Sequence, residues 1–206
     1  MGTFSKISQD AFKDMQLEAG MLLNSFDPAD PDVDDEDIIC ATTGGITVSC
    51  VPTYTDFGED VDNCPNNTKE LKHLDSWDAS ISTTALGMSP AAIKLALGAA
   101  DIGATDTSKV TPRAELKQTD FLDAIWWVGD RVDGGMAAVK LLNALSTGGF
   151  SLTTNKKAKG QLAITIGGHV SINDLDTVPM EFYSTAGEEE TTTTETTTTG
   201  NTGTTP

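Results

Sequence analysis

Apolar and polar residues alternate most regularly near the end of the segment Phe121–Ile172. Within Gln161–Ile172 the apolar positions share one face and the polar positions share the other. This is the period of two that a β-strand with one solvated side shows. The apolar set is Leu162, Ile164, Ile166, Val170 and Ile172, and the polar set is Gln161, Thr165, His169 and Ser171. We therefore predict a strand over Gln161–Ile172.

Turn residues separate the other apolar runs of this region. Asp133-Gly134 reaches positive φ at low steric cost, and we expect Gly160 to close the lysine turn at residues 156–160 in the same manner. Met136–Leu145 also fits a helical period, because Ala, Leu, Met and Lys prefer helices. Tight glycine-rich turns on both sides leave little room for a crossing helix. We predict strand there, and hence a meander of antiparallel strands.

Extended segments are also predicted upstream. Gly44-Gly45 between the apolar runs Ile38–Thr43 and Ile46–Val51 predicts a β-hairpin. Glu70–Leu86 alternates, which predicts a strand, and Val178–Tyr183 predicts a short terminal strand. The expected inward residues of Glu70–Leu86 are Trp77, Ala79, Ile81, Thr83 and Ala85. Two N-terminal segments, Phe4–Ile7 and Phe12–Leu23, are expected to be extended, with Phe12, Leu17, Met21 and Leu22 as buried candidates.

One helix has clear start and stop signals. Ser89 can cap free amides, Pro90 suits the first helical position and Gly98 suits the exit. The residues between them, Ala91–Leu97, are good helix formers apart from one isoleucine. We predict a single short α-helix beside the strands.

The remaining segments are predicted loops. Residues 27–37 form an exposed acidic loop, residues 53–69 a long loop, and residues 101–120 a second polar connection. The Thr- and Glu-rich residues 187–206 cannot bury enough apolar surface to fold, so we expect a disordered tail. Residues 1–186 are then one domain.

Charge narrows the choice of partner. The net charge is −18, and 15 of the 31 acidic residues lie in residues 27–37, 56–62 and 187–206, which hold no Lys or Arg. A groove that grips nucleic acid needs the opposite sign, so we predict no specific binding of DNA or RNA. No apolar run approaches about 18 residues, and the first six residues lack the apolar core of a signal peptide. We expect no membrane span and folding in a cytoplasm.

The residue types give little support for catalysis or for a bound metal. The chain has two histidines and no nucleophile-elbow, phosphate-loop, dinucleotide or zincin motif. Cys40, Cys50 and Cys64 are spaced too widely for a usual zinc site, so buried thiols or an incidental disulfide are favoured over zinc. The acidic loop lacks the glycine and glutamate spacing of a calcium loop, and a solvated charge run is favoured over weak cation binding. We predict no enzyme activity, no cofactor and no metal.

Trp126-Trp127 is more informative. Adjacent strand residues point to opposite faces, and apolar neighbours accompany both indoles. Both faces of this strand must therefore be covered. Either a helix or second sheet of the same chain covers the far face, or a neighbouring subunit does.

Six stretches of the chain carry a likeness to a known family. They are Pro52–Asn67, Leu86–Ala100, Ile125–Asp130, Asn143–Leu152, Gly168-His169 and Val178–Tyr183. Together they resemble the major tail tube protein of long-tailed bacteriophages and prophages of Gram-positive bacteria, over about residues 1–186. The acidic segment at residues 30–37 and the Thr-rich tail fall outside the shared pattern.

The resemblance implies a fold and an assembly. The fold is mainly β, an antiparallel β-sandwich or barrel of the phage tail tube type with one flanking α-helix. Six copies form a ring, and rings stack into a hollow tube through which DNA passes to the host without specific binding. The tail tip, tape measure and tail terminator proteins are the implied partners. The implied location is the tail of the virion, assembled in the cytoplasm of the host bacterium.

The resemblance also implies roles for residues. The loop Thr53–Lys69 would bridge successive rings, and the wall strands would come from Glu70–Leu86 and Phe121–Ile172. The inter-ring candidates are Tyr54, Asp56, Phe57, Asp60, Asn63 and Asn66, and the wall or subunit-interface candidates are Trp77, Trp126, Trp127 and His169. The alternative function is a surface-displayed β-sandwich for adhesion or carbohydrate binding, with the Thr-rich tail as its stalk.

Overall fold

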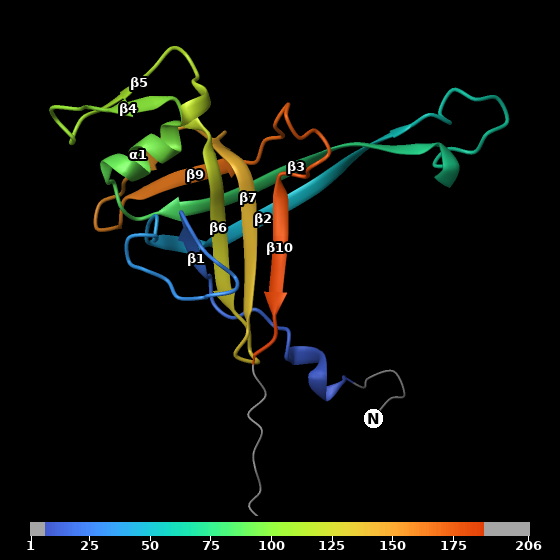
Figure 1. Ribbon diagram of the computed structural model, residues 1–206, viewed down its shortest axis with the longest axis horizontal. Helices are drawn as coiled ribbons and strands as arrows, with labels where there is room; N and C mark the ends of the chain where they lie inside the picture. The colour runs from blue at the N-terminus through green and yellow to red at the C-terminus, as the bar shows by residue number, and fades with distance from the viewer. Residues whose placement is uncertain (1–6, 188–206) are drawn as a thin grey trace, which may run out of the picture.

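The structure is a computed structural model that describes residues 7–187, and Figure 1 shows a mainly antiparallel β protein with one short α-helix. The predicted fold class is confirmed. The strands are β1 (Met21–Leu23), β2 (Thr42–Asp56), β3 (Lys72–Ala85), β4 (Ala100–Ile102), β5 (Val110–Pro112), β6 (Leu122–Asp130), β7 (Met136–Ser146), β8 (Ser151–Thr153), β9 (Gln161–Gly167) and β10 (Met180–Thr185). The helices are α1 (Pro90–Leu97) and the 3-10 helices η1 (Gln9–Phe12), η2 (Lys69–Leu71) and η3 (Gln118–Asp120). The predicted disordered tail lies outside the described residues from position 188 onward, as do Phe4, Ser5 and Lys6.

Eight strands form one sheet that folds over its own core. Its order is β1-β6-β7-β9-β3-β2, with β10 added to β7 and β8 added to β9. The two halves meet where β7 pairs with β9 at Leu145 and Ser146 alone. In Figure 1 the strands β6, β7 and β10 run steeply across β2, β3 and β9. The corner at β7 therefore lets one sheet supply both layers of a sandwich.

The main core lies between these halves. The half with β6 and β7 contributes Ile125, Val139 and Leu141, and the other half contributes residues of β3 and β9. The latter residues are Ala79, Ile81, Ala85, Leu162, Ile164 and Ile166. Each of these six side chains is at most 1% exposed. The period-two patterns predicted for β3 and β9 therefore mark the buried face.

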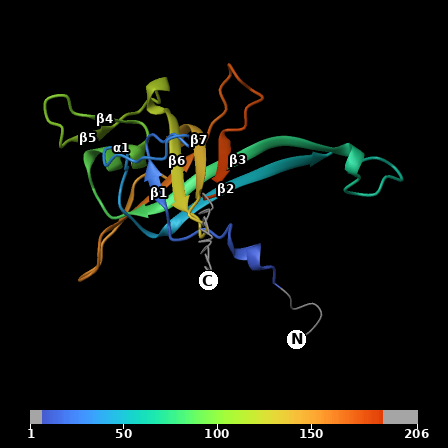
Figure 2. The same cartoon turned by 60° about the horizontal axis from the view of Figure 1, so that its bottom comes forward.

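Helix α1 has the predicted boundaries. The Ser89 side chain accepts a hydrogen bond from the Ala92 amide at 3.1 Å, Pro90 begins the helix, and Gly98 leaves it at φ 70°. Ala92 and Ala96 pack into the main core. The helix closes the side of the sandwich next to β9, as Figure 2 shows.

The predicted hairpin at Gly44-Gly45 is wrong. Thr42–Asp56 is one continuous strand, and the two glycines bulge out of it, since Thr43 pairs with Thr84 and Ile46 with Thr83. Both glycines have positive φ, 77° and 89°, and a Cβ on either would meet nothing. A glycine pair serves a bulge as well as it serves a tight turn, so local sequence does not separate the two.

The predicted loop Thr53–Lys69 is shorter than expected. Its first four residues continue β2, so the connection runs from Phe57 into the short helix η2. The polar connection at residues 101–120 likewise contains a small hairpin of β4 and β5. Arg113 beside it makes ion pairs with Asp101 and Asp120, and Ala100 of β4 is fully buried, so both polar and apolar contacts anchor this hairpin.

The meander of β6, β7 and β9 is confirmed, with two corrections. The lysine turn uses Lys157 at φ 65° as its left-handed residue, and Gly160 does not have positive φ. Strand β9 ends at Gly167, so Val170 and Ile172 do not join the buried face and are 49% and 86% exposed. Just after the strand the chain approaches Pro179 closely, since a Cβ on Gly168 would lie 2.8 Å from the Pro179 carbonyl oxygen.

The N-terminal segment was predicted less well. Leu22 in β1 is fully buried, but Phe12, Leu17 and Met21 are 53%, 39% and 41% exposed. Residues 9–12 form η1 and are not extended. No helix within residues 7–187 is both long and apolar enough to cross a membrane.

Candidate assembly surfaces

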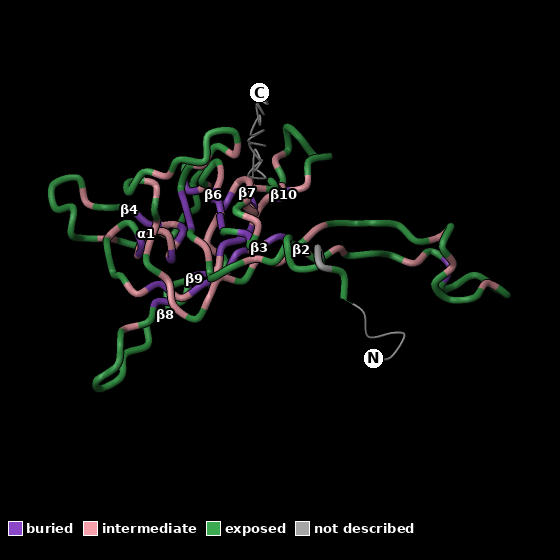
Figure 3. The backbone as a smooth tube through the Cα atoms, turned by 90° about the horizontal axis from the view of Figure 1, so that it is seen from below, coloured by how far each residue is buried: buried purple, intermediate pink, exposed green. Residues whose placement is uncertain are grey.

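The most prominent surface feature is an arm, which we define as residues 51–78. It comprises the far halves of β2 and β3 and the turn between them, and it projects well beyond the sandwich (Figure 1). Figure 3 shows that the arm is exposed along nearly its whole length; Gly58 is its one buried residue. Two paired strands with both faces in solvent bury too little surface to be stable alone.

Polar contacts shape the arm. Strand pairing continues to Asp56 and Lys72, with Asp75 as an extra residue in β3 whose carboxylate accepts a hydrogen bond from Thr55 Oγ1 at 2.6 Å. At the tip, Asp56 accepts from the backbone amides of Gly58 and Asn67 at 2.9 and 2.7 Å. These two hydrogen bonds hold the pKa of Asp56 below its ordinary value. Asp56 is therefore a structural residue of the turn.

All six inter-ring candidates lie in the arm. Tyr54 is 52% exposed beneath the Lys72 ammonium group, and Phe57 is 63% exposed with its ring 6.0 Å from that of His73. Asp60, Asn63 and Asn66 are exposed in the turn. Sequence reasoning missed Val51, Val61 and Leu74, which are 54%, 50% and 41% exposed. No alternation of apolar and polar residues marks these three positions, because the arm has no buried face.

The two adjacent tryptophans point to opposite faces, as predicted for a strand. Trp127 packs against the main core and its indole nitrogen donates to the Ala19 carbonyl at 3.0 Å. Trp126 is 6% exposed in a second cluster with Phe26, Val33 and Tyr183. A loop of the same chain, which includes the predicted acidic segment, therefore covers the far face. The cover is neither the helix nor the second sheet nor the neighbouring subunit that the sequence pattern predicted.

The other two wall candidates lie apart from this pair. Trp77 pairs with Pro52 at the base of the arm and is half-buried. His169 follows β9, where its Nδ1 lies 3.2 Å from the Asn143 carbonyl and its ring meets Phe121 edge-on at 5.3 Å. The four wall candidates thus occupy three separate places on the fold.

Several strands leave an edge open, and β2 and β10 are the longest of them. Among residues 7–187, β2 pairs with β3 alone and β10 pairs with β7 alone. Phe182 of β10 is 64% exposed. Unpaired strand edges offer a row of amide and carbonyl groups to another chain. These edges and the arm are the surfaces best suited to association.

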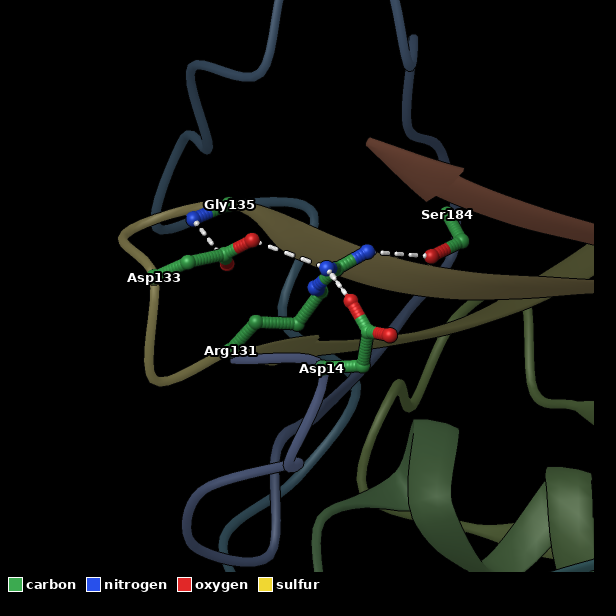
Figure 4. Close-up of polar contacts among 5 residues, drawn as sticks. All are labelled: Asp14, Arg131, Asp133, Gly135 and Ser184. Atoms are coloured by element: carbon green, nitrogen blue, oxygen red, sulfur yellow. Dashed lines mark hydrogen bonds and ion pairs between the residues drawn. The ribbon is translucent and has the colours of Figure 1, made fainter. Parts of the chain in front are cut away.

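A buried arginine ties the base of the sandwich together (Figure 4). Arg131 is 8% exposed and its guanidinium contacts Asp14, Asp133 at 2.8 Å and Ser184 at 2.6 Å. Burial alone would raise the pKa of Asp133, but the Gly135 amide and Arg131 lower it overall. The network joins the N-terminal segment, the β6–β7 turn and β10. Its partners satisfy the charge, so it is a structural clamp.

Groups suited to metal binding or catalysis are scattered. Within the described part of the chain, no cluster of three His, Cys, Asp or Glu side chains is placed to hold a metal. Cys40, Cys50 and Cys64 are all free thiols. Burial raises the pKa of Cys40, and burial together with nearby Asp78 raises that of Cys50. Such thiols are poor nucleophiles at neutral pH.

One cavity of about 530 Å³ lies beside α1. Its apolar walls include Ile38, Ile39, Leu95, Ile102 and Leu122, and Glu36 and Lys94 also line it. This volume is in the range of small-molecule pockets. The cavity is formed by separate elements, which include the segment before β2, α1, β4, β6 and the end of β7.

Comparison with known proteins adds no family. No family model matches the chain, and no curated protein was found to match its sequence.

Proposed function

We propose that this protein is a structural virion protein that self-assembles into stacked hexameric rings, which form the tail tube through which phage DNA is delivered. The arm is the observation that carries the proposal. It exposes Tyr54, Phe57, Val61 and Leu74 on a two-stranded ribbon that no segment of residues 7–187 covers. A soluble monomer has no use for such a ribbon, whereas an assembling subunit buries it against its neighbour.

The open edges of β2 and β10 support the same proposal. Joining these edges between subunits would remove the unpaired strands and continue the sheet from copy to copy. Closed rings follow when the repeated rotation brings the last copy back to the first.

The charge of the chain supports the role of a conduit. The net charge of −18 has the same sign as duplex DNA, whereas retention through counterion release requires basic groups. DNA would then pass along the lumen without adhering. The tail tip, tape measure and tail terminator proteins are the partners that such a tube requires.

Negative-stain electron microscopy and sedimentation velocity on the full chain at rising concentration test the proposal. We expect rings or tubes with a central hole. A matched variant replaces residues 55–73 with Asn-Gly, which joins Tyr54 to Leu74 by a two-residue hairpin turn. It should keep the folded sandwich and lose stacking.

A full-length protein that stays monomeric at all concentrations, even with a tail-tip initiator present, would contradict the proposal. It would direct attention to the cavity beside α1 and to the adhesion alternative, which glycan-array binding by the monomer would test.

A further inference from the structure

A second hairpin, smaller than the arm, projects near the opposite end of the molecule. It connects β8 and β9 and carries Lys156, Lys157 and Lys159, all exposed. Residues 147–161 hold no acidic residue. Within residues 7–187 none of the three ammonium groups has an ion-pair partner, so a compact basic tip faces solvent. Phe150 and Leu152 at its base are 40% and 36% exposed.

The tip of the arm has the opposite character. Residues 56–68 contain no Lys or Arg. Asp56 is occupied in holding the turn, but Glu59, Asp60 and Asp62 are exposed and have no partner within the described chain. Phe57 and Val61 lie among them, 63% and 50% exposed. The arm tip thus carries three unpaired carboxylates beside two apolar side chains. The β8–β9 hairpin carries three unpaired ammonium groups beside two apolar side chains, so the two surfaces are complementary.

The two tips cannot meet within one molecule. Figures 1 and 2 both place the arm tip at one end of the long axis and the β8–β9 turn toward the other. Complementary surfaces at opposite ends of one chain produce a head-to-tail contact between copies. Such a contact repeats without limit, which suits a stack.

We propose that the β8–β9 turn of one copy is the docking surface for the arm tip of the next copy. Lys156, Lys157 and Lys159 then lie against Glu59, Asp60 and Asp62, and Phe57 and Val61 of the arm tip cover Phe150 and Leu152 at the base of the β8–β9 hairpin. This inference rests on the proposed self-assembly and names the contact that joins successive subunits. A second copy is favoured over DNA as the occupant because three lysines form too small a site for duplex DNA in a chain of net charge −18.

Charge reversal tests the pairing directly. One variant carries K156E, K157E and K159E, and the other carries E59K, D60K and D62K. Each should fold as the parent does, because all six side chains are exposed. Each alone should associate at least about tenfold more weakly, because like charges now face each other. An equimolar mixture should recover association, because each variant's arm then meets a turn of opposite sign.

Salt and a matched variant provide the controls. Association of the parent should weaken as salt rises from about 50 mM to about 500 mM, since exposed charges are screened. The control K109E/K117E adds negative charge elsewhere on the surface and should associate as the parent does. Sedimentation velocity and electron microscopy give both readouts.

The outcomes separate this inference from the proposed function. Recovery in the mixture as open rows without a central hole would support the pairing and contradict the tube. Tubes formed by each variant alone would support the tube and overturn the pairing. If each variant alone loses association and the mixture does not recover it, the proposed pairing is also overturned. Loss of DNA retention by the lysine variant, with assembly unchanged, would assign the turn to DNA instead.

Discussion

The two halves of strand β3 differ sharply in burial. Residues 72–78, in the arm, include no buried side chain, whereas Ala79, Ile81, Thr83 and Ala85 are all buried. Both halves pair with β2, but residues 80–85 also pair with β9 on their other edge. The two halves therefore differ in backbone pairing as well as in what their side chains contact.

This difference shows what strand pairing does and does not provide. Pairing satisfies amide and carbonyl groups, but net stability in water comes mainly from apolar surface that is buried. The body, which is the described chain outside residues 51–78, has a core between two layers. The arm has a hydrogen-bonded ribbon without a core. In the free subunit, the amides of the arm should be less protected from hydrogen exchange than those of the body. They should gain the most protection when a partner covers the arm.

The largest expected contrast is between matched leucines in the two regions. Leu141 is fully buried in the core and Leu74 is 41% exposed on the arm. Leu141→Ala should lower the free energy of unfolding by about 3 kcal/mol, because it removes buried methyl groups and leaves a cavity. Leu74→Ala should change it by less than about 0.5 kcal/mol. Urea unfolding of the monomer measures both, and equal losses would mean that the arm packs on the body in solution.

A smaller difference in stability is expected between the replacement of a buried arginine in the body and that of an exposed lysine in the arm. Arg131→Met leaves Asp133 without its buried partner and should cost about 2 kcal/mol of stability. The control Lys72→Met removes an exposed ammonium group from the arm and should cost less than about 0.5 kcal/mol. Thermal unfolding of the two variants against the parent gives the comparison. An Arg131→Met protein as stable as the parent would show that the network in Figure 4 does not clamp the base of the sandwich.

The smallest expected effect is on the pH dependence of stability, which should differ between the body and the arm. Folding holds the pKa of Asp133 and of Asp56 below the ordinary value. Stability linked to a lowered pKa is complete above the unfolded-state value of about 3.9 and is lost as the pH falls toward the folded-state pKa. Asp133→Asn should therefore flatten the acid end of the melting-temperature profile.

Asp56→Asn is the matched variant in the arm. It should leave the acid profile of the body unchanged and speed amide exchange at the arm tip, where the carboxylate holds the turn. Melting curves between about pH 2 and 7 and hydrogen exchange provide the two measurements. The comparison fails if Asp56→Asn alters the profile as much as Asp133→Asn does.

Local signals predicted the elements whose burial is one-sided. Strand β9 as far as Gly167, the inward face of β3 and the cap at Ser89 follow from alternation and from capping chemistry, which act within a few residues. The predictions that failed concern positions whose local sequence suits more than one structure. Gly44-Gly45 suits a turn and a bulge equally, and the pairing of β2 with β3 decides between them.

The candidate surfaces were also predicted only in part. The six inter-ring candidates named from the resemblance lie together in the arm, and their inter-ring role stays a prediction. The ribbon form of the arm was not expected. Phe12, Leu17 and Met21 look like core residues by composition, yet all three are exposed, and Leu22 is the residue of this segment that joins the main core. Which apolar residue reaches the core depends on competition between distant segments.

The amino-acid sequence by itself determined the mainly β class, the single capped helix, the two faces of Trp126-Trp127 and the separation of charge into acidic and basic segments. These properties depend on side-chain period and on turn chemistry, which span a few residues. Tertiary contacts determined that one sheet folds at β7 into two layers, that a loop covers Trp126, and that half of β3 leaves the core as an arm. Those features arise from pairings between residues far apart in the chain, and the shape of the whole core selects among them.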